Sequence, residues 1–438
     1  MFFVIYKNIG IRMQAVMFCA IIVILVGSVL GIYSPVDAFF SIKLNTISLL
    51  IGMYIISTTL DQAGFFDYVA YRIYKLAGND RTKILIMFCI ITYIFSLLVN
   101  NLTTILVIIP MTLNLAARIG FDPRPVVIGE VISSNIGGAS TMIGDFPNML
   151  IASEAGIGFN QFIVFMMPIC MILFAVMLIC LKYRLVFFDN PSDNGNENSY
   201  EDEDKSESSR DRLTYRLTMP KFTARERKTI KRALFILVHM LMLFSLSDLL
   251  SLNPSAIALT GGLSVYLFSG MNKTALLRQI SFNDVFFFTG LFIIVGGLEA
   301  SGLMQYVTRF IMEISMGKPW LCCMVVMWVA AFITAFLSAG PTTALFFPIV
   351  AGIGTVPPHN IIWWSLSLGV LAGSSATLTG ATAGPVATTL VENFSQRYGY
   401  RKAQGARFTF RQFSGAGIPI AIVFLIISNI YILLLNMR

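Results

Sequence analysis

The sequence predicts an all-α polytopic membrane protein built from two inverted-topology repeats. Three observations lead to this fold class: an apolar composition, an internal repeat, and polar helix-breaking motifs inside apolar segments. Of 438 residues, 56% are hydrophobic and 12% are charged, against roughly 25% charged in ordinary soluble domains. Several apolar runs approach the roughly 20 residues that a helix needs to cross a bilayer. The clearest runs are 14–32, 162–181, 233–250 and 418–435.

Composition also excludes several classes of function. The net charge of +8 does not indicate a nucleic-acid partner, because no basic stretch is interleaved with stacking aromatic residues. The six cysteines and two histidines lack metal-ligand spacing, so we expect no metal site and no cofactor. No nucleotide loop, HExxH motif or Ser/His/Asp arrangement is visible, and an enzyme is not expected.

The chain repeats itself. Residues 53–70 (MYIISTTLDQAGFFDYVA) align with residues 291–308 (LFIIVGGLEASGLMQYVT), with Asp61 matched by Glu299. Further along, the aligned pairs are Thr104 with Thr342, Pro110 with Pro348, Gly137 with Gly373, Thr141 with Thr377, and Gly144 with Gly380. A polar, acidic stretch between the halves cannot bury enough apolar surface to fold alone. We therefore predict a first transport repeat over 1–187, a polar linker over 188–232, and a second repeat over 233–438 that begins with an extra span.

Loop charges predict the orientation, because basic loops stay cytoplasmic. They place the N-terminus and the linker in the cytoplasm and the C-terminus on the opposite side. This assignment requires 93–114 and 331–352 to be re-entrant hairpins, whose arms look too short to span and whose tips break the helix. The extra span 233–250 then inverts the second half, as in many secondary transporters. The expected count is about nine crossings plus two hairpins and two broken helices.

The hairpin tips and helix breaks supply the candidate ion or substrate ligands, since non-helical backbone at membrane depth is tolerated where it lines a cavity. In the first half these are Asn100, Asn101, Thr103 and Thr104 at the tip, and Asn135, Gly137, Gly138, Ser140, Thr141, Asp145 and Asn148 at the break. In the second half they are Ser338, Thr342 and Thr343 at the tip, and Ser374, Ser375, Thr377 and Thr379 at the break. Amide, hydroxyl and carbonyl oxygens suit a hard cation, whereas exposed helix N-termini suit an anion.

Asp145 is the leading functional candidate, because a carboxylate at membrane depth is costly and by default functional. It would bind a cation or exchange a proton for it. A second, compatible reading is an N-cap for a half-helix that starts near Phe146 and Pro147. Glu130 is a second proton-coupling candidate, with a polar position near the cytoplasmic end as the alternative. The second half has Ala381 or Ala383 where the first has Asp145.

The motifs NNLTT and SSNIGGASTMIGDFPN resemble the ion transporter superfamily. The similar branch holds arsenite permeases, the type D bacterial sodium/proton antiporter and the pink-eyed-dilution P protein, with citrate transporters more distant. The resemblance implies a scaffold, a mobile transport domain that moves in an elevator-like step, and dimers. The second tip, Ser338 to Pro341, departs from the Asp-Asn pair of related antiporters.

We therefore predict a secondary active ion transporter, with cation (sodium)/proton antiport ahead because neither break contains Lys or Arg. The first alternative is proton- or sodium-coupled transport of a small anion such as a carboxylate or arsenite. The second is an uncoupled channel or a transporter-like scaffold. The expected partners are a small inorganic ion or small anion, the lipid bilayer and a second copy of the chain.

Overall fold

The computed structural model describes residues 9–66, 68–69, 71–72, 80–119, 121–188, 222–271, 273–274, 276, 281–354, 360–397 and 408–437. The regular secondary structure within these ranges is helical, which confirms the predicted fold class. Most of the predicted linker, residues 189–221, lies outside the described residues.

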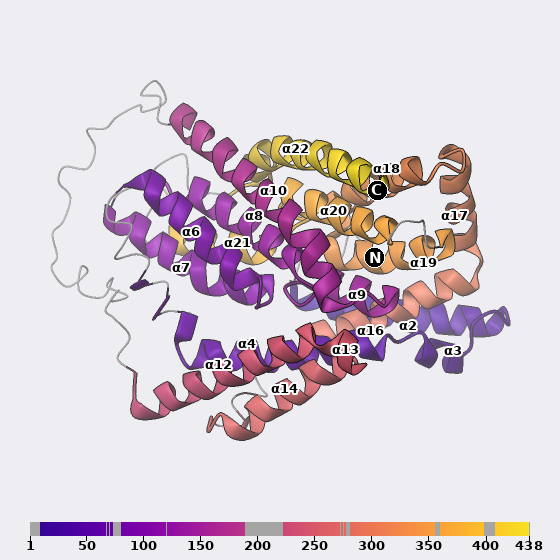
Figure 1. Ribbon diagram of the computed structural model, residues 1–438, viewed down its shortest axis with the longest axis horizontal. Coiled ribbons are helices and arrows are strands. Elements are labelled where there is room, and N and C mark those ends of the chain that lie inside the picture. Colours follow the sequence, from indigo (N-terminus) through magenta and orange to yellow (C-terminus); the bar gives the residue numbers. More distant parts are fainter. Residues whose placement is uncertain are drawn as a thin grey trace.

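Figure 1 shows the helices in two bundles. The lower bundle contains α2 (Ile9–Val29), α3 (Pro35–Phe40), α4 (Leu44–Gln62), α12 (Ala224–Ser245), α13 (Ser247–Leu250), α14 (Pro254–Phe268) and α16 (Phe282–Ala300). The upper bundle contains α6 (Arg81–Ser96), α7 (Asn101–Ile119), α8 (Arg124–Ser140), α9 (Phe146–Ala155), α10 (Phe159–Phe188), α18 (Pro319–Leu337), α19 (Ala339–Ile353), α20 (Ile361–Ala376), α21 (Gly384–Arg397) and α22 (Phe410–Asn436). Helix α17 (Leu303–Ile314) follows α16 and packs against α18 and α19.

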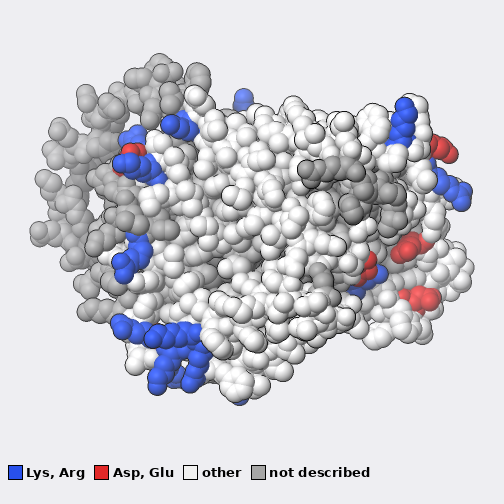
Figure 2. All heavy atoms as spheres, in the orientation of Figure 1, with Lys and Arg blue, Asp and Glu red and all other residues white. Residues whose placement is uncertain are grey.

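Five of the described helices are long and apolar enough to cross a membrane: Leu44–Gln62, Phe159–Tyr183, Phe282–Ala300, Pro319–Leu337 and Phe410–Asn436. On the face shown in Figure 2, Lys, Arg, Asp and Glu lie toward the two ends of the molecule, and the surface between them is largely uncharged. An uncharged band of this kind is typical of a protein that spans a bilayer.

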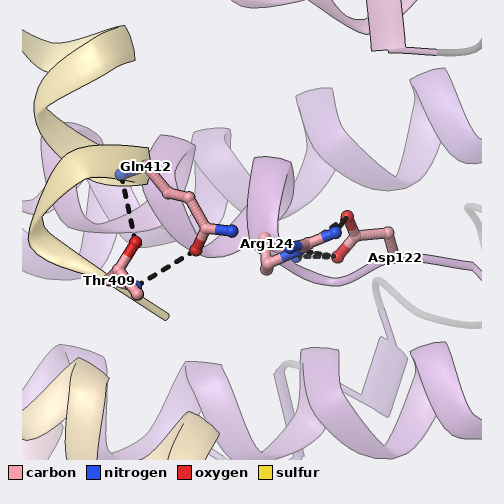
Figure 3. Close-up of polar contacts among 4 residues, drawn as sticks. All are labelled: Asp122, Arg124, Thr409 and Gln412. Carbon is pink, nitrogen blue, oxygen red and sulfur yellow. Dashed lines mark hydrogen bonds and ion pairs between the residues drawn. The ribbon is translucent and has the colours of Figure 1, made fainter. Parts of the chain in front are cut away.

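Polar residues at the helix starts explain where several helices begin. Thr409 and Gln412 form a capping box at the start of α22, with backbone-to-side-chain distances of 3.1 and 3.4 Å (Figure 3). Such a box satisfies backbone N–H groups that have no partner within the helix. At the start of α8, Arg124 Nη2 lies 2.7 Å from Asp122 Oδ2, and this ion pair holds the turn that precedes the helix (Figure 3).

The two predicted hairpins exist, but their arms are longer than expected. The first consists of α6 and α7, and the second of α18 and α19, which meet at Ser338. The expectation that the arms are too short to span is wrong for α18, which has 19 apolar-rich residues. The reason is that no helix breaker interrupts the chain between Pro319 and Leu337. The two hairpins lie toward opposite ends of the molecule (Figure 1), and their re-entrance remains a prediction.

The internal repeat is visible in matching contacts. Thr141 donates a hydrogen bond to Leu97 O at 2.7 Å, and Thr377 donates one to Ala335 O at 2.5 Å. Each threonine oxygen also accepts a bond from a glycine N–H three residues later, Gly144 at 3.1 Å and Gly380 at 2.9 Å. Both predicted helix breaks are confirmed, between α8 and α9 and between α20 and α21. The halves thus share one hairpin-and-break construction.

Candidate functional site

Asp145 lies at the first helix break, between the end of α8 and the start of α9. Its backbone is extended, and its Oδ1 accepts a hydrogen bond from Phe146 N at 2.9 Å, so it is the N-cap of α9. Pro147 suits the first turn that follows, where no N–H is needed. The side chain is buried, with 8% of its surface exposed. The capping role is confirmed and leaves the second carboxylate oxygen free for another partner.

That partner is Asn101, the first residue of α7. Its Nδ2 donates to Asp145 Oδ2 at 3.0 Å, while its Oδ1 accepts from Ser96 Oγ at 2.5 Å. Asn101 is fully buried, and its amide therefore joins the hairpin tip to the helix break. Both of these partners of the Asp145 carboxylate are neutral N–H groups. The group therefore keeps a full negative charge when ionised, which favours a cation or a proton as its counterpart.

Gly138 lets these two side chains meet. A Cβ atom on it would lie 2.6 Å from Asn101 Oδ1 and 3.0 Å from Asp145 Cβ. Gly137 has a similar role at the preceding position, where a Cβ would collide with the carbonyl oxygen of Tyr93. Any other residue at these positions would separate α8 from the hairpin.

The two breaks are packed against each other across the repeats. Asn135 Nδ2 donates to the carbonyl oxygen of Ser374 at 3.0 Å, and Ser367 Oγ donates to Asn148 Oδ1 at 2.8 Å. Asn148 Nδ2 in turn donates to Gly138 O at 3.1 Å and to Thr141 O at 3.2 Å. The amides of the first break thus satisfy carbonyl oxygens that the broken helix leaves without partners.

The hydroxyl groups of the second half donate to backbone carbonyls. Thr342, Thr343, Ser374 and Ser375 donate to backbone carbonyls within their own helices or caps, and Thr377 and Thr379 donate to Ala335 O. Ser140 in the first half likewise donates to Ile136 O. These bonds hold the hydroxyl protons, so the oxygens can still accept a bond or bind a cation. The structure does not join these second-half hydroxyls directly to Asp145 by hydrogen bonds.

The remaining tip residues lie as follows. Asn100 Oδ1 accepts from Leu102 N at 2.8 Å, at the start of α7. Thr103 is partly exposed, and Thr104 is buried with no partner for its hydroxyl among the described residues. Ser338 has φ 74° and ψ 162°, a region otherwise occupied by glycine that costs of order 1–3 kcal/mol. The second tip therefore makes a tight reversal between α18 and α19.

Glu130 is a second buried carboxyl group, separate from the Asp145 contacts. It lies on α8 with none of its surface exposed, and Thr112 of α7 donates a hydrogen bond to its Oε1. Within the described ranges its Oε2 has no hydrogen-bond partner. Glu130 is therefore part of a buried α7–α8 contact, and its role in proton coupling stays a prediction.

Sequence reasoning missed two side chains that reach the site from the lower bundle. Tyr54 of α4 donates to Asp284 Oδ2 of α16 at 2.6 Å and accepts from Asn100 Nδ2 at 3.3 Å. Phe288 of α16 stacks on Phe146, with ring centroids 3.4 Å apart. The only available signal was Asp284, an acidic residue in the first turn of an apolar helix. The site therefore lies where the two bundles meet.

The comparisons with known proteins indicate that this chain is a membrane transporter. The sequence model of a family described as "Citrate transporter" matches residues 1–369. The magnetosome protein MamN of Paramagnetospirillum magneticum is 34% identical over 99% of this chain and 97% of the relative. An uncharacterised transporter of Mycobacterium tuberculosis is 29% identical over 93% of this chain and 91% of its own length.

Two further likenesses support the fold and the sequence resemblance. The P protein of Sus scrofa is 27% identical, over 90% of this chain but 53% of the longer relative. The YdaH transporter of Alcanivorax borkumensis, whose crystal structure is described as having an unusual topology, matches with a TM-score of 0.62. That match is 10% identical and covers 96% of this chain and 97% of the other. The superfamily resemblance drawn from the motifs is confirmed.

Proposed function

Because the chain belongs to the citrate transporter family, we propose that it is a secondary active carrier that exchanges a cation such as sodium for protons by alternating access, with Asp145 as the central charge. The observation that supports this most is the buried Asp145 carboxylate, held by neutral N–H donors at the meeting point of two bundles. A transport role, rather than catalysis, is also what the relatives indicate.

The helix break suits a cation electrostatically. The last carbonyls of α8 carry the negative end of its dipole, and the first N–H groups of α9 stabilise the Asp145 carboxylate. A cation next to Asp145 would therefore meet carboxylate, carbonyl and hydroxyl oxygens, the ligands that hard cations prefer. A proton on Asp145 would remove the charge that holds the cation. Competition between the two for one carboxylate gives coupled exchange.

The test is a pH-gradient dye assay with the purified protein in liposomes, adding sodium, lithium and potassium in turn. Asp145→Asn should abolish cation-dependent dissipation of the gradient and leave the fold intact, since Asn caps a helix about as well as Asp. The Asn101 amide can rotate to accept from the new amide, because Ser96 Oγ both donates and accepts.

Asp80→Asn is the matched control, because Asp80 caps α6 at an exposed position outside the site. It should transport like the wild type. Full activity of Asp145→Asn would contradict the proposal, and so would a wild-type protein that moves no cation. The latter outcome favours a transporter-like scaffold, and an anion-flux screen would then follow.

Transport of a small carboxylate is the second candidate, and the family description favours it. An anion next to Asp145 would meet repulsion unless a cation or proton binds with it. Half-helix N-termini at α7, α9 and α19 would supply the N–H donors for such an anion. Citrate or arsenite flux without cation-dependent proton movement would support this candidate over antiport.

The proposal also covers the group that supplies protons to the site, the orientation of the chain in the membrane and its association into dimers. Glu130 is the second proton-coupling group, because it is a buried carboxyl without a charged partner among the described residues.

The N-terminus and the linker face the cytoplasm, the C-terminus faces the opposite side, and two copies associate in the bilayer. The similarity to MamN, which is named a magnetosome protein, favours a magnetosome as the place where this protein acts.

A further inference from the structure

Tyr54 connects the ion site to the lower bundle. It lies on α4 with 6% of its surface exposed, and its hydroxyl group is the shared atom between Asp284 of α16 and Asn100 at the first hairpin tip. Asn100 precedes Asn101, which holds Asp145. One hydroxyl group of the lower bundle therefore lies next to the residue pair that presents the central charge.

The direction of each bond follows from the number of donors. An ionised carboxylate only accepts hydrogen bonds, so Tyr54 donates its single hydroxyl proton to a hydrogen bond with Asp284 Oδ2 at 2.6 Å. The Tyr54 oxygen must then accept from Asn100 Nδ2 at 3.3 Å. This choice turns Asn100 Oδ1 toward Leu102 N at 2.8 Å, where it caps α7. Asp284 therefore determines the orientation of the Asn100 amide through Tyr54.

Asp284 is itself well placed to accept this hydrogen bond. It lies in the first turn of α16 and is partly exposed, and the N-terminal end of a helix stabilises a negative charge. Its hydrogen bond to Tyr54 joins α16 to α4 within the lower bundle. The bond from Asn100 then crosses to the upper bundle.

We propose that Tyr54, oriented by Asp284, is a positioning residue of the ion site: it fixes the first hairpin tip so that Asn101 presents its amide to Asp145. This inference rests on the proposed function. The plainer alternative is that a buried tyrosine hydroxyl simply needs a partner. The two differ in what they predict, because a positioning residue changes the KM for the cation and a purely structural bond changes only stability.

The test compares four variants in the liposome assay, with the KM for the transported cation and the maximal rate as readouts. Tyr54→Phe removes the hydroxyl group and keeps the ring. Asp284→Ala removes the acceptor of the tyrosine proton. We expect Tyr54→Phe and Asp284→Ala each to raise the KM by about tenfold, because that factor corresponds to the loss of one hydrogen bond near a charge. Asp284→Asn keeps an acceptor oxygen and should restore a KM near that of the wild type.

Tyr33→Phe is the matched control. Tyr33 is another buried tyrosine of the lower bundle, whose hydroxyl bonds to Ser41 at 2.9 Å and to Ile293 O at 3.0 Å without touching the hairpin tip. It should lower thermal stability and leave the KM unchanged.

An unchanged KM in Tyr54→Phe, or equal KM changes in Asp284→Asn and Asp284→Ala, would overturn the inference while the proposed function stands. A wild-type protein that moves no cation contradicts the proposed function itself, and the inference falls with it. The two failures are therefore separate.

Discussion

Asn101 and Asp145 form a buried pair that only the first half of the molecule possesses. The repeat aligns Asn101 with Ala339 and Asp145 with Ala381, and both alanines are buried. Losing one partner would leave a buried polar group unsatisfied, which costs about 1–3 kcal/mol and more for a charge. Losing both together avoids that cost. The second tip and break are therefore neutral at these two positions, and the carboxylate at the helix break comes from one repeat.

The same logic predicts coupling between the two residues. Asn101→Ala should lower the melting temperature of the detergent-solubilised protein, because it strips the Asp145 carboxylate of a donor at 3.0 Å. Adding Asp145→Asn should recover some of the loss, since burying an unpaired amide costs less than burying an unpaired carboxylate. Thermal unfolding of the wild type, both single variants and the double variant measures this. Strictly additive effects would contradict a direct interaction.

At the scale of the element, each broken helix has a threonine that bonds to the preceding hairpin. The equivalence of Thr141 and Thr377 predicts a loss of stability in both halves. Thr141→Val and Thr377→Val keep the side-chain shape but leave a glycine N–H without its partner, and each removes one donor from a carbonyl of the hairpin, of which Ala335 O keeps its bond from Thr379. Each should destabilise the protein by about 1–3 kcal/mol.

Thr389→Val is the control, because Thr389 is exposed on α21 and its hydroxyl group donates to Pro385 O of its own helix. Its effect should stay within about 0.5 kcal/mol. Thermal unfolding in detergent measures the stability of all three variants. A large effect in one half alone would show that the second break, which lacks the carboxylate, is held together differently.

At the scale of the whole molecule, an ion pair joins the two bundles away from Asp145. Lys43, just before α4, lies 2.9 Å from Glu154 on α9, and its Nζ also lies 4.8 Å from the ring centroid of Phe347 on α19. The repeat aligns Lys43 with Ser281 and Glu154 with Leu390. The matching contact in the second half thus has no charge. The Lys43–Glu154 ion pair would therefore stabilise the present arrangement of the two bundles over the arrangement in which the two repeats exchange roles.

Charge reversal tests this link. Lys43→Glu and Glu154→Lys should each lower the transport rate severalfold, because like charges at this separation repel, and the exchanged double variant should restore it. Lys83→Glu is the control, since Lys83 pairs with Asp80 at 3.7 Å next to it on one exposed helix start and such pairs contribute little. Silent single variants, or a double variant as slow as the singles, would argue against relative movement of the bundles at this contact.

The amino-acid sequence by itself determined the features that depend on local order. Apolar runs, the repeat, the helix breaks and the Asp145 cap were all readable, because a proline, a glycine or a capping carboxylate acts within a few residues of its own position. The family followed from the same short motifs. Only the hairpin arms were misjudged, since a helix boundary without a breaker leaves little local trace.

The tertiary structure alone decided which polar groups meet. Tyr54 and Asp284 lie 230 residues apart, and Asn148 and Ser367 lie 219 apart, so no local pattern pairs them. It also decided which backbone carbonyls accept the second-half hydroxyl groups, because that depends on which carbonyls the packing leaves within reach. The Asp145 carboxylate could be predicted from sequence because it lies in a local motif at the helix break. Its position between two bundles could not, because that depends on contacts made across the whole fold.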